Sequence, residues 1–164
     1  ARRRMQVIAD FQFGQGAGLA LFPEGCEAIL SRTGRVRQIS LEGNRLATVR
    51  AMDGRLTLGI EGALRLLSCL TPPAYRVTAA ADVAEFVRTG KNTFAKHVIA
   101  ADPGIRAGDE VMVVDDQDHL LATGSALLSG EEILFFNYVV AAFSYPLLLL
   151  PTAASGLISV VAVS

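Results

Sequence analysis

Apolar and polar residues alternate through the first third of the chain, and this pattern predicts an antiparallel sheet. Alternation is typical of a half-buried strand, because successive side chains of a strand point to opposite faces. Glu42-Gly43-Asn44 and Asp53-Gly54 are turn sequences of the type that joins neighbouring strands. We therefore expect a curved meander with strands at residues 28–31, 36–41, 46–50 and 56–60.

Helical spacing is found before and after these predicted strands. Residues 2–10 begin with three arginines and predict a strand or a helix, and a short helix is expected at 18–22. A leucine-rich helix is expected over residues 64–70, and Pro72-Pro73 terminates it. Because this proline pair is the best boundary signal in the chain, we expect a small α+β domain over residues 1–72.

After the proline pair the pattern becomes one helix among short strands. Asp82 and Glu85 form a variant of the capping box, so a helix is predicted from Asp82 to Gly90, a residue type that commonly ends helices. The acidic residues 115–118 form the tip of a predicted hairpin. Strands are expected at residues 75–78, 97–99, 110–114 and 120–126. We expect these elements to form a second domain over residues 74–144.

Charge is divided unevenly between the two halves. Residues 1–76 contain eleven arginines and six acidic residues, whereas residues 77–164 contain four basic and ten acidic residues, for net charges of +5 and −6. The planar guanidinium group suits phosphate contacts. We expect Arg35, Arg37 and Arg50, which occupy polar positions of the predicted strands, to share one exposed face that contacts phosphates. The alternative is an ordinary solvated face with salt bridges.

Residues of catalytic or metal-binding type are few and scattered. Cys26 and Cys69 belong to no CxxC motif or Cys/His cluster, so we expect two buried free thiols and no zinc site. His97 and His119 are the only histidines, and the acidic residues 115–118 lack the spacing of a calcium-binding loop. We therefore expect no catalytic residue, no cofactor and no metal site.

Three segments of the second half follow one another in the order of a known family. Residues 83–98 give a helix, a glycine-containing loop and a strand; residues 102–111 contain the pattern P-x-I-x-x-G-D-x-V; and residues 122–126 end a hairpin. This order resembles the PUA domain, a small RNA-binding barrel. Residues 8–37 resemble the domain that precedes the PUA domain in archaeal tRNA-guanine transglycosylases. The resemblance to the C-terminal part of the archaeosine-forming transglycosylase covers roughly residues 5–140.

This resemblance implies an α+β fold, with a small α+β N-terminal domain followed by a PUA-type β-barrel with short helices. It also implies a non-catalytic RNA-binding protein, because the chain is too short for the catalytic barrel of the transglycosylase and lacks its zinc cysteines. The expected partners are RNA, in this family the acceptor stem and 3′ end of tRNA, and a tRNA-modifying enzyme of archaeosine formation in the cytoplasm. A protein–protein interaction module and a C-terminal fragment of the transglycosylase are the alternatives.

In PUA proteins the loop after the first helix and the strand that follows it line the RNA groove. The resemblance therefore predicts RNA contacts in this segment, at Arg88, Gly90, Lys91, Asn92, Thr93, Phe94 and Lys96. The glycine allows close approach of a backbone, the lysines supply charge, and the short polar side chains suit a ribose 2′-OH. Ordinary surface lysines are the alternative for Lys91 and Lys96, and a core position is the alternative for Phe94.

The end of the chain fits the family pattern less well. Residues 133–164 carry no charge, and residues 139–143 fit the closing strand of the barrel without the basic residues that family members have there. Residues 145–164 form an apolar tail with no counterpart. The tail is long enough to span a membrane, but its two prolines and the lack of flanking basic residues argue against a spanning helix. We expect it to wrap the core or to form a homodimer contact; a non-native segment is the next alternative.

Overall fold

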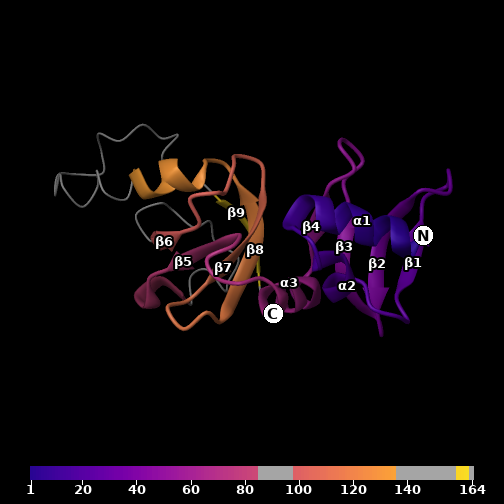
Figure 1. Ribbon diagram of the computed structural model, residues 1–164, viewed down its shortest axis with the longest axis horizontal. Helices are drawn as coiled ribbons and strands as arrows, with labels where there is room; N and C mark the ends of the chain where they lie inside the picture. The colour runs from indigo at the N-terminus through magenta and orange to yellow at the C-terminus, as the bar shows by residue number, and fades with distance from the viewer. Residues whose placement is uncertain (85–97, 136–157, 163–164) are drawn as a thin grey trace. The chain divides into compact units, whose positions relative to one another are not determined.

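The computed structural model describes residues 1–84, 98–135 and 158–162, and the chain divides into two compact units. Unit 1 comprises residues 1–71 and unit 2 comprises residues 72–164, with the division between Thr71 and Pro72. Figure 1 shows the elements of each unit. Both units combine helices with an antiparallel or mixed sheet, which confirms the predicted α+β class.

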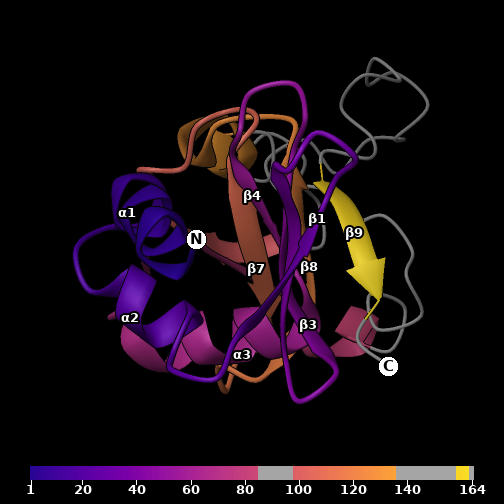
Figure 2. The ribbon, with the colours of Figure 1, turned by 90° about the vertical axis from the view of Figure 1, so that its right-hand side faces the viewer.

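Unit 1 is a four-stranded antiparallel sheet with three helices. The sheet has the order β1-β2-β3-β4, as expected for a meander, and Figure 2 shows α1 and α2 together on one side of it. The strands lie within two residues of their predicted bounds, and the first segment is a helix. In chain order the elements are α1 (Arg2–Phe13), α2 (Ala17–Leu21), β1 (Glu27–Leu30), β2 (Val36–Leu41), β3 (Asn44–Val49), β4 (Leu56–Leu58) and α3 (Ile60–Cys69).

The amphipathic helix α1 closes the core of unit 1. Its Met5, Ala9 and Phe13 are buried and spaced four residues apart, so they share one face. Gln12 is also buried, and its amide forms two hydrogen bonds with the backbone of Leu56: Nε2 donates to the carbonyl at 2.9 Å, and the Leu56 N–H donates to Oε1 at 2.8 Å. This pair fastens α1 to β4.

Helix α3 approaches the sheet closely because two glycines face strand β3. The N–H of Gly59 donates to the carbonyl of Leu46 at 2.8 Å. A Cβ atom at Gly59 would collide with the carbonyl oxygen of Arg45, and a Cβ at Gly62 would collide with that of Leu46. The β2–β3 register shifts beside this contact. Backbone therefore packs directly on backbone at the start of α3.

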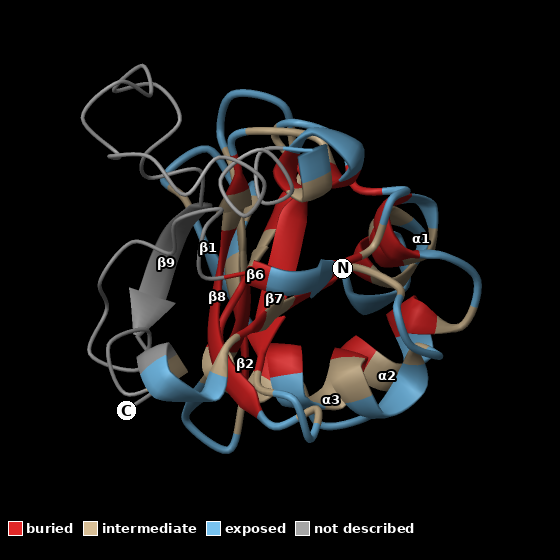
Figure 3. Ribbon diagram, turned by 90° about the vertical axis from the view of Figure 1, so that its left-hand side faces the viewer, coloured by how far each residue is buried: buried red, intermediate tan, exposed pale blue. Residues whose placement is uncertain are grey.

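Unit 2 is a five-stranded sheet with the order β6-β5-β7-β8-β9. Strand β5 runs parallel to β7, and the other neighbours are antiparallel. Strands β7 and β8 are buried along most of their lengths and form the centre of the core (Figure 3). The elements of unit 2 include β5 (Arg76–Ala79), the 3₁₀ helix η1 (Ala81–Val83), β6 (Val98–Ala101), β7 (Glu110–Val114), β8 (Leu120–Ala126) and β9 (Ile158–Ala162). A further helical segment is described over residues 130–135.

The start of the helix predicted over residues 82–90 differs from expectation. The chain turns into η1 one residue earlier, with Ala80 as the N-cap, and no side chain caps this turn. The predicted cap at Asp82 is therefore wrong: Asp82 lies inside the first turn, where its negative charge still suits the helix N-terminus. Glu85 and Gly90 lie outside the described residues.

Strand β9 comes from the apolar tail, which we expected to wrap the core or to form a homodimer contact. It pairs with β8 in an antiparallel ladder from Ala122 opposite Ala162 to Ala126 opposite Ile158. Residues 139–143, the predicted closing strand, lie outside the described residues. Within the described ranges, no helix has both the length and the apolar character that a membrane span requires.

Candidate functional site

The predicted RNA-contacting loop of unit 2 belongs to the segment 85–97, which the structure does not describe. It therefore gives no position for His97 or for the seven residues predicted there, namely Arg88, Gly90, Lys91, Asn92, Thr93, Phe94 and Lys96.

The three predicted arginines of unit 1 occupy different surroundings. Arg35 is exposed in the turn that leads into β2, and Arg37 is exposed on β2 where the register with β1 shifts. Arg50 instead forms an ion pair with Asp53, with 3.1 Å between Nη2 and Oδ2, and its side chain is 25% exposed. The charge of Arg50 is therefore compensated, whereas Arg35 and Arg37 make no ion pair with a described residue.

Arg35 lies at a hollow of about 500 Å³, which we call the unit 1 pocket. Helix α1 contributes Arg4 and Met5, and the strands contribute aliphatic side chains. The complete lining is Ala1, Arg4, Met5, Leu30, Gly34, Arg35, Val36 and Val49. The pocket thus combines two guanidinium groups with an aliphatic wall. Of the two arginines in this pocket, only Arg35 was predicted from the sequence as a phosphate contact. The run of three arginines at residues 2–4 was the signal that could have indicated Arg4.

A network of hydrogen bonds fixes the turn that presents Arg35. The Ser31 N–H donates to the Arg35 carbonyl at 2.7 Å, and the Arg35 N–H donates to Ser31 Oγ at 3.1 Å. Gly34, whose φ of 76° favours glycine, donates to the Ser31 carbonyl at 3.0 Å. The backbone of Arg35 is therefore held in place independently of any ligand.

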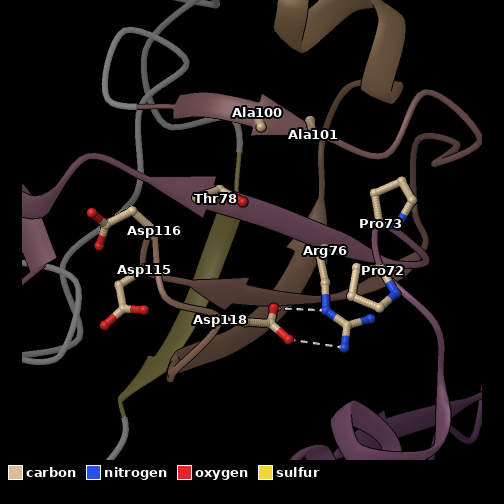
Figure 4. Close-up of a pocket in the computed structure, with 9 residues that line it drawn as sticks. All are labelled: Pro72, Pro73, Arg76, Thr78, Ala100, Ala101, Asp115, Asp116 and Asp118. Carbon is tan, nitrogen blue, oxygen red and sulfur yellow. Dashed lines mark hydrogen bonds and ion pairs between the residues drawn. The ribbon is translucent and has the colours of Figure 1, made fainter.

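A second hollow, of about 230 Å³, lies in unit 2 beside the acidic hairpin tip (Figure 4). Its main polar feature is Arg76, which is 4% exposed and bonds both carboxylate oxygens of Asp118, at 2.8 Å from Nε and 3.2 Å from Nη2. Fork-shaped pairs of this kind are strong and directional. Sequence reasoning missed this pair, because its members are 42 residues apart.

Asp115 organises the same hairpin tip. Its carboxylate accepts hydrogen bonds from the N–H groups of Gln117 and His119 at 2.9 and 2.8 Å, and it lies 3.1 Å from His119 Nδ1. Burial raises the pKa of Asp115, but these hydrogen bonds and the nearby histidine outweigh burial, so the pKa lies below its ordinary value. His119 is exposed, and its ring contacts this carboxylate.

Both cysteines are free, but the prediction that they are buried is wrong. Cys26 is half-buried, and Cys69 is exposed because it is the last residue of α3, one turn beyond the last buried side chain of that helix. Burial raises the pKa of the Cys26 thiol, while the positive charges of Arg65 and Arg2 oppose this rise. Among the described residues no three potential metal ligands come together.

Two family models match consecutive parts of the chain. Residues 3–73 match the patch-forming domain C2 of tRNA-guanine transglycosylase, and residues 75–141 match the PUA domain. The tRNA-guanine(15) transglycosylase of Pyrococcus abyssi is 54% identical over 138 residues, which are 84% of this chain and 23% of the relative. That of Methanothermobacter thermautotrophicus is 46% identical over 136 residues, which are 82% of this chain and 21% of the relative. The chain thus spans about a quarter or less of these relatives' length.

Solved structures support the fold. A hypothetical protein of Pyrococcus horikoshii superposes with a TM-score of 0.69 at 17% identity, covering 98% of this chain and 88% of the other. A PUA domain protein of Thermoplasma acidophilum gives a TM-score of 0.61 at 16% identity, covering 99% and 89%. The chain is therefore a PUA-domain protein, and its two domains are similar to the C-terminal region of archaeal tRNA-guanine transglycosylases.

Proposed function

We propose that this chain is a non-catalytic, cytoplasmic RNA-binding protein that binds tRNA and assists its modification in archaeosine formation. The observation that carries the proposal is the pairing of a PUA domain with a transglycosylase C2 domain, at 46–54% identity to transglycosylases over most of this chain. Neither matched family model describes a catalytic domain. The chain then supplies RNA affinity, and a separate or attached transglycosylase part supplies the chemistry.

The charge distribution fits this role. Arg4, Arg35 and Arg37 are exposed in unit 1 and carry no compensating ion pair among the described residues. Guanidinium groups of this kind neutralise phosphates and release counterions, so the affinity for RNA falls as salt rises. In unit 2 we assign further RNA contacts to the basic segment from Arg88 to Lys96.

A gel-shift titration with total tRNA at about 50 mM and about 200 mM salt tests the proposal, and we expect affinity to fall by about tenfold or more between them. The double variant K91E/K96E should weaken binding by more than about tenfold. Arg106→Glu is the matched control, because Arg106 is an exposed basic residue of the same unit outside that segment. Absence of binding, or binding that ignores salt, would contradict the proposal.

A protein contact is the second candidate function, and exposed apolar side chains on α1 and α2 favour it. Val7 and Phe11 lie one turn apart on α1 and are 61% and 94% exposed, and Leu19 on α2 is 72% exposed. Large apolar side chains in such an exposed group commonly mark interfaces. The partner on this view is the tRNA-modifying enzyme. Phe11→Glu should abolish co-elution with that enzyme, whereas Met52→Glu, at an equally exposed position (89%), should not.

We also retain a homodimer through the apolar tail as a proposal. Light scattering of the full chain tests it: a dimer mass for both the wild type and Phe11→Glu supports a contact through the tail, whereas a monomer mass contradicts the homodimer.

A further inference from the structure

We propose that the unit 1 pocket binds one unstacked nucleotide of the RNA, with its phosphate on Arg4 and Arg35 and its base against the aliphatic wall. This inference rests on the proposed RNA-binding function and adds a defined subsite in unit 1. Four properties of the pocket carry it: its size, its charge, its wall and the rigidity of its rim.

The size of the pocket suits a small planar ligand together with its phosphate. Its volume of about 500 Å³ lies within the range of about 300–1,000 Å³ that small-molecule sites occupy. A phosphate alone would leave most of this space empty. The hollow therefore has room for a whole nucleotide.

The charge of the pocket is positive and uncompensated. Some arginines of unit 1 pair with acids: Arg2 with Glu24 at 3.8 Å, and Arg50 with Asp53 at 3.1 Å. Arg4 and Arg35, which line the pocket, make no ion pair with a described residue. Two guanidinium groups at one hollow provide forked donors, and phosphate oxygens are the acceptors that such donors match best.

The wall between these charges is aliphatic. Met5 is buried beneath the pocket, Val36 and Val49 are half-buried, and Leu30 is 53% exposed on the edge strand β1. Apolar side chains that remain open to solvent beside two cations favour a ligand that is flat and apolar at one end and anionic at the other. Sequence-tolerant RNA recognition combines cations for the phosphates with side chains on which an unstacked base packs, commonly aromatic rings or guanidinium planes. In this pocket the packing surface is aliphatic, beside two guanidinium groups.

The rim of the pocket is fixed before a ligand arrives. Ser31 holds Arg35 through backbone and hydroxyl hydrogen bonds, and the register shift between β1 and β2 falls beside Leu30 and Val36. Such irregularities redirect side chains and are common next to binding sites. A preformed rim lowers the entropic cost of capturing a mobile nucleotide.

The test compares tRNA affinity among single variants of the full chain, by fluorescence anisotropy with labelled total tRNA. Arg35→Gln removes one guanidinium, and Leu30→Thr removes the most exposed side chain of the aliphatic wall while leaving every charge in place. Arg35→Gln should weaken binding by about tenfold through the lost phosphate contact, and Leu30→Thr by about fivefold through the lost apolar contact. Arg32→Gln is the matched control, because Arg32 belongs to the same turn but does not line the pocket; it should lower affinity by no more than about threefold. Val49→Thr removes apolar surface of the wall on another strand at nearly constant volume, and it replaces Leu30→Thr if that variant misfolds.

Methyl NMR of the wild-type chain gives the second readout. Total tRNA should shift the signals of Leu30, Val36 and Val49, whereas inorganic phosphate at matched ionic strength should not. If wild type binds tRNA and the pocket variants bind as well as Arg32→Gln does, the pocket assignment is overturned while the RNA-binding function stands. If wild type binds no tRNA, the proposed function fails, and the pocket assignment fails with it.

Discussion

Buried polar side chains connect parts of each unit that are far apart in the sequence. Gln12 bonds the backbone of Leu56, and the Arg76 guanidinium bonds the carboxylate of Asp118. A buried polar group that loses its partner pays its full desolvation cost, so such pairs are more sensitive to substitution than their small net contribution suggests.

We expect Gln12→Leu to lower the free energy of unfolding of unit 1 by about 2 kcal/mol or more, because it leaves the N–H and carbonyl of Leu56 without their partner. Urea unfolding measures the change. Gln15→Leu, at an exposed position just after α1, is the control and should have little effect. If Gln12→Leu and Gln15→Leu lowered the free energy of unfolding equally, the Gln12 amide would not be what holds α1 against β4.

Asp115 makes the stability of unit 2 depend on acidity. Its pKa in the folded chain lies below the ordinary value of 3.8, so its stabilisation is fully present above that pH and is lost as the pH falls through the folded pKa. Asp115→Asn keeps an acceptor for the turn but cannot titrate. Between about pH 6 and about pH 3 the wild type should therefore lose more stability than the variant, as measured by urea midpoints. If the wild type and Asp115→Asn lost the same stability between these pH values, the link between Asp115 and stability would be contradicted.

At the scale of elements, periodicity predicted the strands of unit 1 within two residues, because each strand repeats a local alternation of apolar and polar side chains. The packing of the helices was not predictable in this way. A Cβ atom at Gly59 or Gly62 would collide with a carbonyl oxygen of β3, and no local sequence pattern reveals this contact. The unit 1 pocket shows the same limit, since Arg35 stands at a polar strand position while Arg4 and Val49 reach it from distant elements.

Gly62→Ala should displace α3 from β3 and destabilise unit 1 by about 1–3 kcal/mol, the usual cost of overpacking, because its new Cβ meets the carbonyl of Leu46. Leu64→Ala on the same helix is the control, since Leu64 is 43% exposed and its loss should cost much less. Thermal unfolding followed by circular dichroism compares them. A stabilised Gly62→Ala variant would mean that helix propensity outweighs the contact.

At the scale of the whole molecule, the two units can be observed separately. All three tyrosines (Tyr75, Tyr138 and Tyr145) lie in the sequence of unit 2, and the chain has no tryptophan. Tyrosine fluorescence therefore reports on unit 2 alone, while far-ultraviolet circular dichroism reports on both units.

Val160→Pro tests whether β9 is an integral strand of unit 2. Proline interrupts the strand opposite Gly124, because its ring fixes φ away from the strand value and it has no backbone N–H. The variant should lower the unfolding midpoint seen by tyrosine fluorescence and should leave the unit 1 transition unchanged. Unaltered tyrosine unfolding would show that the tail contributes nothing to the sheet.

The position of β9 in the chain also has a consequence for synthesis on the ribosome. Unit 1 builds its sheet from neighbouring strands within residues 27–58, so it can fold while the rest of the chain is still being made. Unit 2 places β9 beside β8 across an interval of more than thirty residues. The edge of β8 therefore stays open until the last strand emerges, and during that interval a chaperone or another nascent chain can reach it.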